Sequence, residues 1–347
     1  MAARPAALLA TARAAVVALA AAVVLAGCTQ PAGPPAASGA TSPAATRAAT
    51  SAGTAATPSI PAPTDPTGRT PVPVSPTPRP RPARPFDADR VLAGIRALAA
   101  IGPRDAASPA SDRAAAYVAD RLRAEGYRVS LVPFRVPAGV SWGVRVPAGT
   151  SVDVVADPPG FDPLAPHVVV GAHLDTVPQS PGAEDDASGL MVLAELARMA
   201  REQPGRLPVR FVAFGAEEAR GGRGTLYAFG SRHLVGTLDA AGRRAVRGMV
   251  ALDRVGVRAA AVPVCHVPGG DRALADAIRR AAPVRTTACE NRASDHVSYA
   301  RAGIPAARLG SVPYAGYHSE RDVPAVVDRG QLARSGAVVW AWLRSVR

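Results

Sequence analysis

Side chains that bind metal ions recur in this chain after short apolar runs, and this pattern constrains the fold more than any other feature. The runs cover residues 168–172, 209–214 and 249–252. Runs of this length and composition are typical of parallel strands that are buried on both faces. Ligands of an open α/β sheet gather beyond the carboxyl ends of such strands, so the pattern predicts one site built from distant residues. The candidate metal ligands are His173, Asp185, Glu218, Asp253 and His318, with the further carboxylate Glu217 beside the third.

Helical and strand patterns alternate along residues 86–347, which predicts a three-layer α/β/α sandwich whose mixed central sheet is parallel at its centre. This part of the chain has about 262 residues, near the upper size for one hydrophobic core, and we expect a single domain. Apolar residues at helical spacing predict helices, and alternating apolar and polar residues predict strands. The predicted helices span 89–101, 111–125, 189–201 and 271–282, with a last helix through Trp340, and two alternating strands span 128–132 and 150–156.

The first 28 residues have the features of a removable export signal. Arg4 and Arg13 supply its positive start, residues 14–24 form an apolar stretch, and residues 25–28 read Leu-Ala-Gly-Cys. This ending resembles the lipobox of bacterial lipoprotein signals, which implies that Cys28 is acylated and begins the mature chain. The alternative is an uncleaved anchor helix, although the apolar stretch is shorter than the ~20 residues that span a bilayer. Both interpretations predict export, and the lipobox predicts a lipid anchor on the outer face of the bacterial cell membrane.

Residues 29–85 consist mainly of Ala, Pro, Thr, Ser and Gly, without an apolar pattern that would bury a core. We expect a disordered tether between the predicted anchor and the folded domain. Proline-rich segments are extended, at roughly 3 Å per residue, so such a tether would hold the domain clear of a membrane.

The formal net charge of +13 comes from arginine, because the chain contains no lysine. Basic chains are candidates for binding nucleic acid or anionic surfaces. Here the arginines are spread along the sequence without a concentrated basic run or interleaved aromatic residues, so we expect no nucleic-acid partner. The membrane, reached through Cys28, is a predicted partner, and we expect the protein to be a monomer.

Cys265 and Cys289 remain as a pair once Cys28 is set aside. Disulfides persist in exported domains, so we expect these two residues to be bridged. The bridge would close a loop of about 24 residues and stabilise the fold by on the order of 3 kcal/mol. Two unpaired buried thiols are the alternative, because the sequence does not show whether the Cα atoms lie within ~7 Å of each other.

Each block of candidate ligands has a plainer interpretation when it is taken alone. In the first block, His173 and Asp175 project to one side of an extended backbone, where the carboxylate can orient a metal-bound imidazole; two polar residues at a strand end are the alternative. In the second block, three successive acids at 184–186 precede a helix, and helix capping explains one of them. In the third block, Glu218 can bind metal while Glu217 remains free as a base, and a solvated acidic pair is the alternative.

Five short motifs in a fixed order are more specific than any one of these blocks. They are His173-x-Asp175, Gly182-Ala183-Glu184-Asp185-Asp186-x-Ser188-Gly189, Glu217-Glu218, Leu252-Asp253-x-Val255-Gly256 and Tyr317-His318-Ser319. Together they resemble the co-catalytic dizinc exopeptidases, the family that includes bacterial leucyl aminopeptidase and aminopeptidase S. The likeness extends from about Leu92 to the C-terminus. It implies a zinc metallopeptidase that removes N-terminal residues from peptides with a free N-terminus.

The resemblance implies two zinc ions that are bridged by Asp185. His173 and Asp253 would complete the ligands of one ion. Glu218 and His318 would complete the ligands of the other. Manganese or cobalt would also suit a site so rich in oxygen ligands.

The resemblance also implies which residues act on the substrate. Glu217 would be the general base. Tyr317 would stabilise the oxyanion, although a packing role for this tyrosine is equally open. The Asp185–Asp186 peptide bond is often cis in the family, and we expect a cis bond here. Glu184 departs from the pattern, because many relatives carry Asn or Asp at this position.

Three other functions remain open for a chain of this kind. Carboxypeptidase-like cleavage and glutaminyl cyclisation occur on similar folds, and some relatives have become non-catalytic binding modules. Cyclases of this type resemble the family but carry serine in place of Asp186 and use one zinc ion. All predicted ligands and the predicted base are present here, which favours catalysis over a binding role.

The remaining histidines match no ligand position, and we expect them to have structural or surface roles. Ser294-Asp295-His296 contains the residue types of a serine hydrolase. A catalytic triad is assembled in space from distant residues, so this contiguous segment is not interpreted as a nucleophile site. The unassigned histidines are His167, His233, His266 and His296.

Overall fold

The computed structural model describes residues 84–221 and 226–347. The predicted signal segment with Cys28 and the predicted tether up to residue 83 lie outside the described residues, as do residues 222–225. Within the described part, no helix has both the length and the apolar character that a membrane crossing requires.

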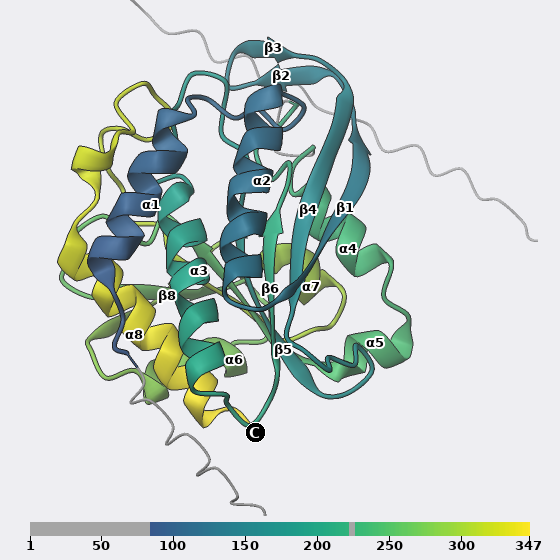
Figure 1. The fold of residues 1–347 in the computed structure, drawn as a ribbon, viewed down its shortest axis with the longest axis vertical. Coiled ribbons are helices and arrows are strands. Elements are labelled where there is room, and N and C mark those ends of the chain that lie inside the picture. Colours follow the sequence, from purple (N-terminus) through teal and green to yellow (C-terminus); the bar gives the residue numbers. More distant parts are fainter. Residues whose placement is uncertain (1–83, 222–225) are drawn as a thin grey trace, which may run out of the picture. The chain divides into compact units, whose positions relative to one another are not determined.

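Eight strands form one mixed sheet, in the order β1-β4-β6-β5-β7-β10-β8-β9 (Figure 1). The four central strands β6, β5, β7 and β10 run parallel to one another. Antiparallel pairs join β1 to β4, β4 to β6 and β8 to β10. The predicted mixed sheet with a parallel centre is therefore confirmed. The strands are β1 (Arg128–Val136), β4 (Gly149–Asp157), β5 (His167–His173), β6 (Val209–Phe214), β7 (Val246–Asp253), β8 (Val262–His266), β9 (Thr286–Glu290) and β10 (Ala306–Gly310).

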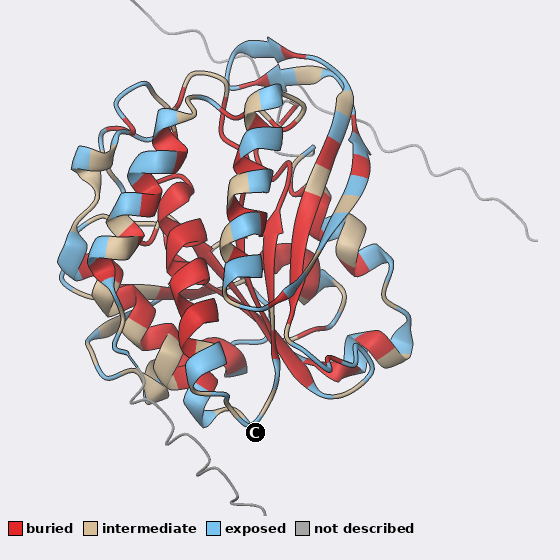
Figure 2. Ribbon diagram, viewed as in Figure 1, coloured by how far each residue is buried: buried red, intermediate tan, exposed pale blue. Residues whose placement is uncertain are grey.

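Helices on both faces of the sheet complete the predicted three layers. The larger core lies between the sheet and helices α1, α2, α3, α6 and α8, and a smaller core lies between the opposite face and helices α4 and α7. The central strands and most of α3 are buried between these layers (Figure 2). The helices are α1 (Ala88–Ala100), α2 (Pro109–Ala124), α3 (Ala187–Glu202), α4 (Phe229–Gly236), α5 (Ala240–Ala245), α6 (Ala273–Ala281), α7 (His296–Arg301) and α8 (Arg329–Ser345).

The side chains of each central strand alternate between the two faces of the sheet, so one sheet contributes to both hydrophobic cores. In β7, Val250 and Leu252 face the larger core, while Met249 and Ala251 face the smaller one. Successive side chains of a strand point to opposite faces, so a strand covered on both faces needs apolar residues at every position. The continuous apolar runs in the sequence therefore mark the central strands.

The predicted elements are present with shifted boundaries. The strand predicted over 128–132 continues to Val136 as β1. A hairpin of two short strands, β2 (Gly139–Ser141) and β3 (Val144–Val146), was not predicted. Strands this short carry too few residues for an alternating pattern, and the turn between them places Trp142.

The predicted disulfide between Cys265 and Cys289 is present. Both residues lie in the same register of β8 and β9, neighbouring parallel strands at the edge of the sheet, with their Cα atoms 4.3 Å apart. The bridge therefore attaches the edge strand β9 to the rest of the sheet.

The chain direction across the sheet reverses at β5. This strand lies in the sheet between β6 and β7, the two strands that follow it in the sequence. A crevice forms beyond the carboxyl end of a strand at such a switch point, and ligands of open α/β sheets bind there. His173 is the last residue of β5 and Asp253 is the last residue of β7, so both border this crevice.

Candidate metal centre

The predicted metal ligands meet at the carboxyl ends of the central strands. His173 ends β5, Asp253 ends β7, and Glu218 follows the end of β6. Asp185 stands just before α3, and His318 comes from the segment after β10. All five side chains are buried and line one cavity of about 440 Å³.

Asp185 lies between the two histidines of the cluster. Its Oδ1 atom is 3.0 Å from Nε2 of His173, and its Oδ2 atom is 3.1 Å from Nε2 of His318. The same nitrogen of His318 is 3.1 Å from Oε1 of Glu218. Ligands of a tetrahedral zinc ion, at bond lengths of roughly 2.0–2.1 Å, lie about 3.3 Å apart. The residues therefore fit a metal ion on either side of Asp185.

Two overlapping groups of ligand atoms support this fit. Atoms of His173, Asp185 and Asp253 lie within 4.8 Å of one another, and so do atoms of Asp185, Glu218 and His318. Burial lowers the pKa of His318, but its hydrogen bonds to Asp185 and Glu218 outweigh burial and raise that pKa to about 9. A metal ion binds the neutral imidazole, so in this cluster it would take the place of the proton.

Asp186 organises the backbone around the cluster. Its carboxylate accepts the N–H of Gly189 at 3.0 Å and thereby caps α3. It also accepts the N–H groups of His173 and Arg254, at 3.1 and 3.2 Å. The expected cis peptide bond joins Asp185 to Asp186. One carboxylate thus connects the ends of β5 and β7 to the start of α3.

Glu184, the departure from the family pattern, reaches the segment that follows β7. Its carboxylate accepts the N–H of Gly256 at 2.9 Å and the N–H of Val257 at 3.0 Å. Burial raises the pKa of Glu184 to about 8, although these N–H donors oppose the shift. The three successive acids therefore have three different partners, and capping accounts for one of them.

The carboxylate of Asp175 does not orient the imidazole of His173, contrary to the expectation. The Nδ1 atom of His173 lies 3.0 Å from the backbone oxygen of Asp175 and 3.8 Å from the carboxylate. Because β5 ends at His173, the alternation of an extended strand no longer places the two side chains together. The carboxylate instead accepts the N–H groups of Glu217 and Glu218, at 2.8 and 3.0 Å. Asp175 therefore holds the acidic pair in position.

Glu217 lines the cavity with a carboxylate that accepts no hydrogen bond from the described residues. Its N–H is held by Asp175. Burial raises the pKa of Glu217, and the charges of Glu218 and Asp253 raise it further. The preceding Ala216 has a φ of 54°, a conformation that residues with a side chain rarely adopt outside functional sites. A carboxylate with a raised pKa is suited to accept and return a proton.

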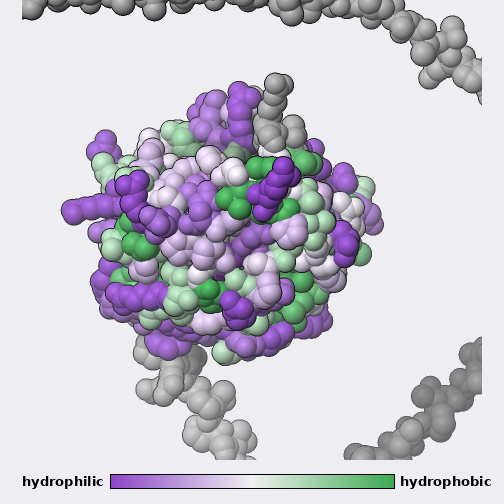
Figure 3. Space-filling model, turned by 90° about the horizontal axis from the view of Figure 1, so that it is seen from above, coloured by the Kyte–Doolittle hydropathy of each residue, from purple (hydrophilic) through white to green (hydrophobic). Residues whose placement is uncertain are grey.

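Aromatic side chains form the rim of the cavity. The ring of Tyr317 stacks on His318 with 3.7 Å between centroids, and Arg254 lies over Tyr317 at 4.3 Å. Trp142, in the β2–β3 turn, packs against His318 in a T-shaped arrangement with 4.2 Å between the ring centroids. The sequence analysis did not assign Trp142, because an aromatic residue in a short loop has no recognisable pattern. Seen from the end that carries this hairpin, the surface is mostly hydrophilic with small, separate hydrophobic patches (Figure 3).

Two buried charged residues hold the loop between His173 and the helix α3. Arg104 donates hydrogen bonds to the backbone oxygens of Leu174 and Gly182, at 3.0 and 3.1 Å. Asp322 accepts the N–H of Asp185 at 3.1 Å. The sequence analysis gave neither residue this role, since side chains that bind backbone groups leave no spacing pattern in the sequence.

Two arginines contact the carboxylate of Asp253. Arg308, which is 2% exposed, lies 2.7 Å from Oδ1 of Asp253, and Nε of Arg254 lies 3.6 Å from the same atom. The sequence analysis missed both contacts. Arg308 had a usable signal, because an arginine within an apolar strand is rarely buried without an acidic partner.

The four unassigned histidines lie outside the groups of clustered ligands in the described part of the chain. Among the described residues, neither ring nitrogen of His296 nor the hydroxyl of Ser294 has a hydrogen-bond partner. The segment Ser294-Asp295-His296 therefore forms no triad of its own. The other three histidines are His167, His233 and His266.

Comparisons with known proteins identify the family of this chain. Residues 153–343 match peptidase family M28. Aminopeptidase YwaD from Bacillus subtilis (strain 168) is 32% identical over 189 residues, which cover 50% of this chain and 40% of that protein. The chain therefore aligns with less than half of the length of this relative.

Solved structures share the fold. BSAP, a zinc aminopeptidase from Bacillus subtilis, matches with a TM-score of 0.66 and 20% identity, over 75% of this chain and 95% of that chain. A glutaminyl cyclase from Bacteroides thetaiotaomicron matches with a TM-score of 0.65 and 18% identity, over 77% of this chain and 100% of that chain. At such identities the likeness shows the fold alone. The family match, however, spans more than half of the sequence and includes every clustered ligand, and the chain belongs to peptidase family M28.

Proposed function

We propose that the protein is an aminopeptidase that removes N-terminal residues from peptides with the help of two zinc ions. The observation that carries this proposal is the position of Asp185, with one carboxylate oxygen near each histidine. A carboxylate placed in this way can bridge two metal ions. Manganese or cobalt are the other ions that this ligand set would accept.

His173 and Asp253 would hold one ion on one side of Asp185, and Glu218 and His318 would hold the other. Bound zinc would polarise the scissile carbonyl and lower the pKa of a water molecule. The backbone oxygen of Asp175 holds Nδ1 of His173, so the opposite ring nitrogen faces the cluster.

Glu217 would move the proton in this mechanism. Its raised pKa makes it a base able to take a proton from the attacking water and return it to the leaving amine. Asp175 holds its backbone N–H and thereby fixes its position. Burial raises the pKa of Tyr317, so the phenol keeps its proton at neutral pH and would donate a hydrogen bond to the oxyanion.

The test is hydrolysis of leucine p-nitroanilide by the purified, zinc-loaded protein, with N-acetylated leucine p-nitroanilide as the control substrate. We expect cleavage of the free-amine substrate alone, lost on chelation and reduced roughly 10²–10⁴-fold in Glu217→Gln. Asp120→Asn, on the exposed surface of α2, is the matched control variant. Equal cleavage of both substrates would exclude an aminopeptidase.

Glutaminyl cyclisation is the second candidate, because a glutaminyl cyclase shares this fold. The acid at position 186 and a ligand set for a second ion favour hydrolysis. An assay of N-terminal glutaminyl peptides by mass spectrometry separates the two reactions. Loss of ammonia from the peptide without cleavage would identify a cyclase.

We also propose that Cys28 is acylated and anchors the domain to the outer face of the bacterial membrane through the segment that precedes residue 84. The support is the Leu-Ala-Gly-Cys sequence at 25–28. Metabolic labelling with a palmitate analogue should mark the wild-type chain and not Cys28→Ser. Equal labelling of both chains would refute the proposal.

A further inference from the structure

The cavity is lined by basic residues as well as by the acidic metal ligands. Four arginines line it, the same number as the acids Asp185, Glu217, Glu218 and Asp253. Bound divalent ions would balance the charge of these acids, so the arginines of the loaded site would remain as excess positive charge. The lining arginines are Arg254, Arg292, Arg301 and Arg308.

Two of these arginines have an acidic partner and two do not. Arg308 and Arg254 contact Asp253, at 2.7 and 3.6 Å. Arg292 and Arg301 are exposed and form no ion pair with any residue that the structure describes. Their guanidinium groups are therefore available to a ligand that enters the cavity.

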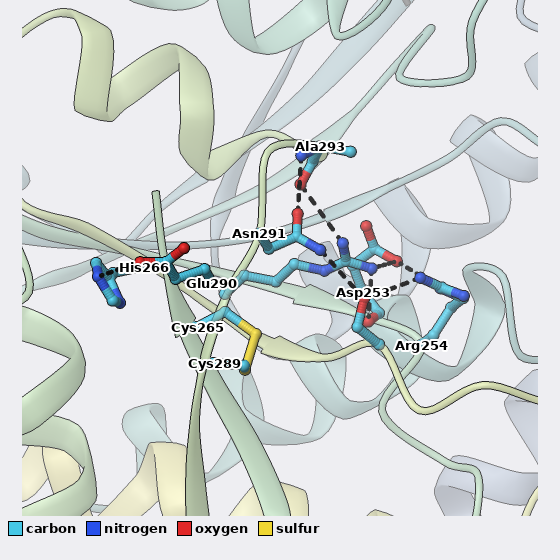
Figure 4. The surroundings of a disulfide bond; sticks show 10 residues. Asp253, Arg254, Cys265, His266, Cys289, Glu290, Asn291 and Ala293 are labelled. Carbon is cyan, nitrogen blue, oxygen red and sulfur yellow. Dashed lines mark hydrogen bonds and ion pairs between the residues drawn. A yellow bond between two sulfur atoms is a disulfide. The ribbon is translucent and has the colours of Figure 1, made fainter. Parts of the chain in front are cut away.

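The loop that carries Arg292 is held in place. The backbone N–H of Asn291 donates to the backbone oxygen of His266 at 2.9 Å. The side-chain oxygen of Asn291 accepts the N–H of Ala293 at 2.8 Å (Figure 4). The hydroxyl of Tyr227 donates to the backbone oxygen of Arg292 at 3.2 Å. The disulfide lies two residues before Asn291 and joins β9 to β8. A loop fixed at both sides loses little entropy when its arginine binds a ligand.

We propose that Arg292 and Arg301, together with the half-buried Arg254 of the same cavity, bind a carboxylate of the substrate close to the scissile bond. This inference rests on the proposed peptidase function. Guanidinium groups bind carboxylates through paired hydrogen bonds, and the acidic residues of the same cavity suit the N-terminal ammonium group. The protein would therefore prefer short peptides that carry a carboxylate, supplied either by an acidic residue in the first two positions or by the C-terminus of a dipeptide.

Calorimetric binding of four peptides to zinc-loaded Glu217→Gln protein tests this proposal without relying on catalysis. Leu-Leu amide has no carboxylate, while Leu-Leu, Glu-Leu amide and Leu-Glu amide each carry one at a different place. We expect at least one of the three acidic peptides to bind roughly 10-fold or more tightly than Leu-Leu amide. The peptide that does so identifies the source of the carboxylate, and equal affinities for all four overturn the proposal.

The arginines are tested by Arg292→Gln combined with Arg301→Gln, in the same Glu217→Gln background. This protein should lose the preference for acidic peptides, and high salt should weaken the preference of the parent. Arg244→Gln is the control, because Arg244 lies in α5, directly before β7, whose opposite end carries Asp253. A double variant that keeps the full preference would contradict the assignment.

Cleavage assays of the same peptides by the wild-type protein separate the two proposals. Tighter binding of an acidic peptide without cleavage of any peptide supports the carboxylate site and refutes the aminopeptidase. Cleavage of all peptides with equal kcat/KM and equal affinity supports the aminopeptidase and refutes the carboxylate site.

Discussion

The ligand cluster has two ends that share Asp185: the first is formed by Glu218 and His318, and the second by His173 and Asp253. The groups that compete with a metal ion differ between these two ends. At one end, burial raises the pKa of Glu218 to about 7, and hydrogen bonds to the carboxylates raise the pKa of His318 to about 9 against the effect of burial. At the other end, burial raises the pKa of Asp253, but the nearby positive charges, of which Arg308 at 2.7 Å is the strongest, together outweigh burial and lower it. Protons compete with a metal ion at both ends, because burial lowers the pKa of His173 but its hydrogen bond to Asp185 and the nearby carboxylate charges together raise it well above its usual range. At the second end a metal ion also competes with the guanidinium group of Arg308.

Two ends with the same residue types in the sequence can therefore differ in the charges that surround them. Each end offers one histidine and one carboxylate besides Asp185. Metal affinity at both ends depends on pH, because protons must leave His318 and Glu218 at the first end and His173 at the second. Metal affinity at the second end depends on the arginine, since like charges repel at short distance. We expect the two ends to bind zinc with unequal affinity above neutral pH, the second end more weakly.

The largest effect is expected when the shared residue is changed. Asp185→Asn should lower zinc affinity at both ends and reduce hydrolysis by more than roughly 100-fold, since changing only a hydrogen-bond partner of a ligand costs roughly 10- to 100-fold. His318→Asn changes one end, and it should retain one zinc ion per chain after dialysis. Zinc content measured by mass spectrometry checks both variants. Retention of the wild-type zinc content by Asp185→Asn would contradict the shared position.

Removing the guanidinium group of Arg308 should destabilise the metal-free protein and strengthen zinc binding at Asp253. Arg308→Met removes the closer of the two guanidinium partners of the buried Asp253 and leaves only the longer contact with Arg254. Breaking a buried ion pair costs up to about 3–5 kcal/mol of unfolding free energy, and we expect a loss approaching this size in the absence of metal. Zinc should restore most of this loss by pairing with Asp253. Urea unfolding with and without zinc provides the measurement. Arg254→Met is the control, and its loss of stability should be smaller because its contact with Asp253 is longer. A metal-free Arg308→Met protein as stable as the wild type would contradict the role of Arg308 at the second end.

The first end should respond to pH. His318 and Glu218 bind protons below pH values of about 9 and 7, and zinc requires both groups to be deprotonated. Zinc binding should therefore release two protons below pH 7, one between pH 7 and 9, and none above pH 9. Affinity should rise about 10-fold per pH unit for each proton released. Calorimetry of His173→Asn, in buffers with different ionisation enthalpies, counts these protons at the isolated first end. A proton count that does not change with pH would contradict the prediction.

The smallest effect is expected at Glu184. Its carboxylate holds the N–H groups of Gly256 and Val257, directly after Asp253. Glu184→Gln keeps the length of the side chain and should lower zinc affinity at the Asp253 end by about 10-fold or less, with no change at the Glu218 end. Titration of zinc into the variant resolves the two affinities. An equal fall at both ends would show that Glu184 supports the whole cluster.

Much of the fold was predictable because burial on both faces leaves a continuous apolar run. The central strands β5, β6 and β7 follow from such runs, and the residues at their carboxyl ends follow from the rule for open sheets. The hairpin with Trp142 was not predictable, because its strands have three residues each. The Cys265–Cys289 bridge was predicted and is present.

The identity and order of the candidate ligands follow from the amino-acid sequence, since strand ends and helix starts are encoded locally. What each of these side chains contacts depends on the tertiary structure. Asp175 holds the acidic pair through the backbone instead of orienting His173, and Arg308 reaches Asp253 from the neighbouring strand. Contacts of this kind depend on the register between strands and on the points where strands end, and both are set by packing across the whole sheet.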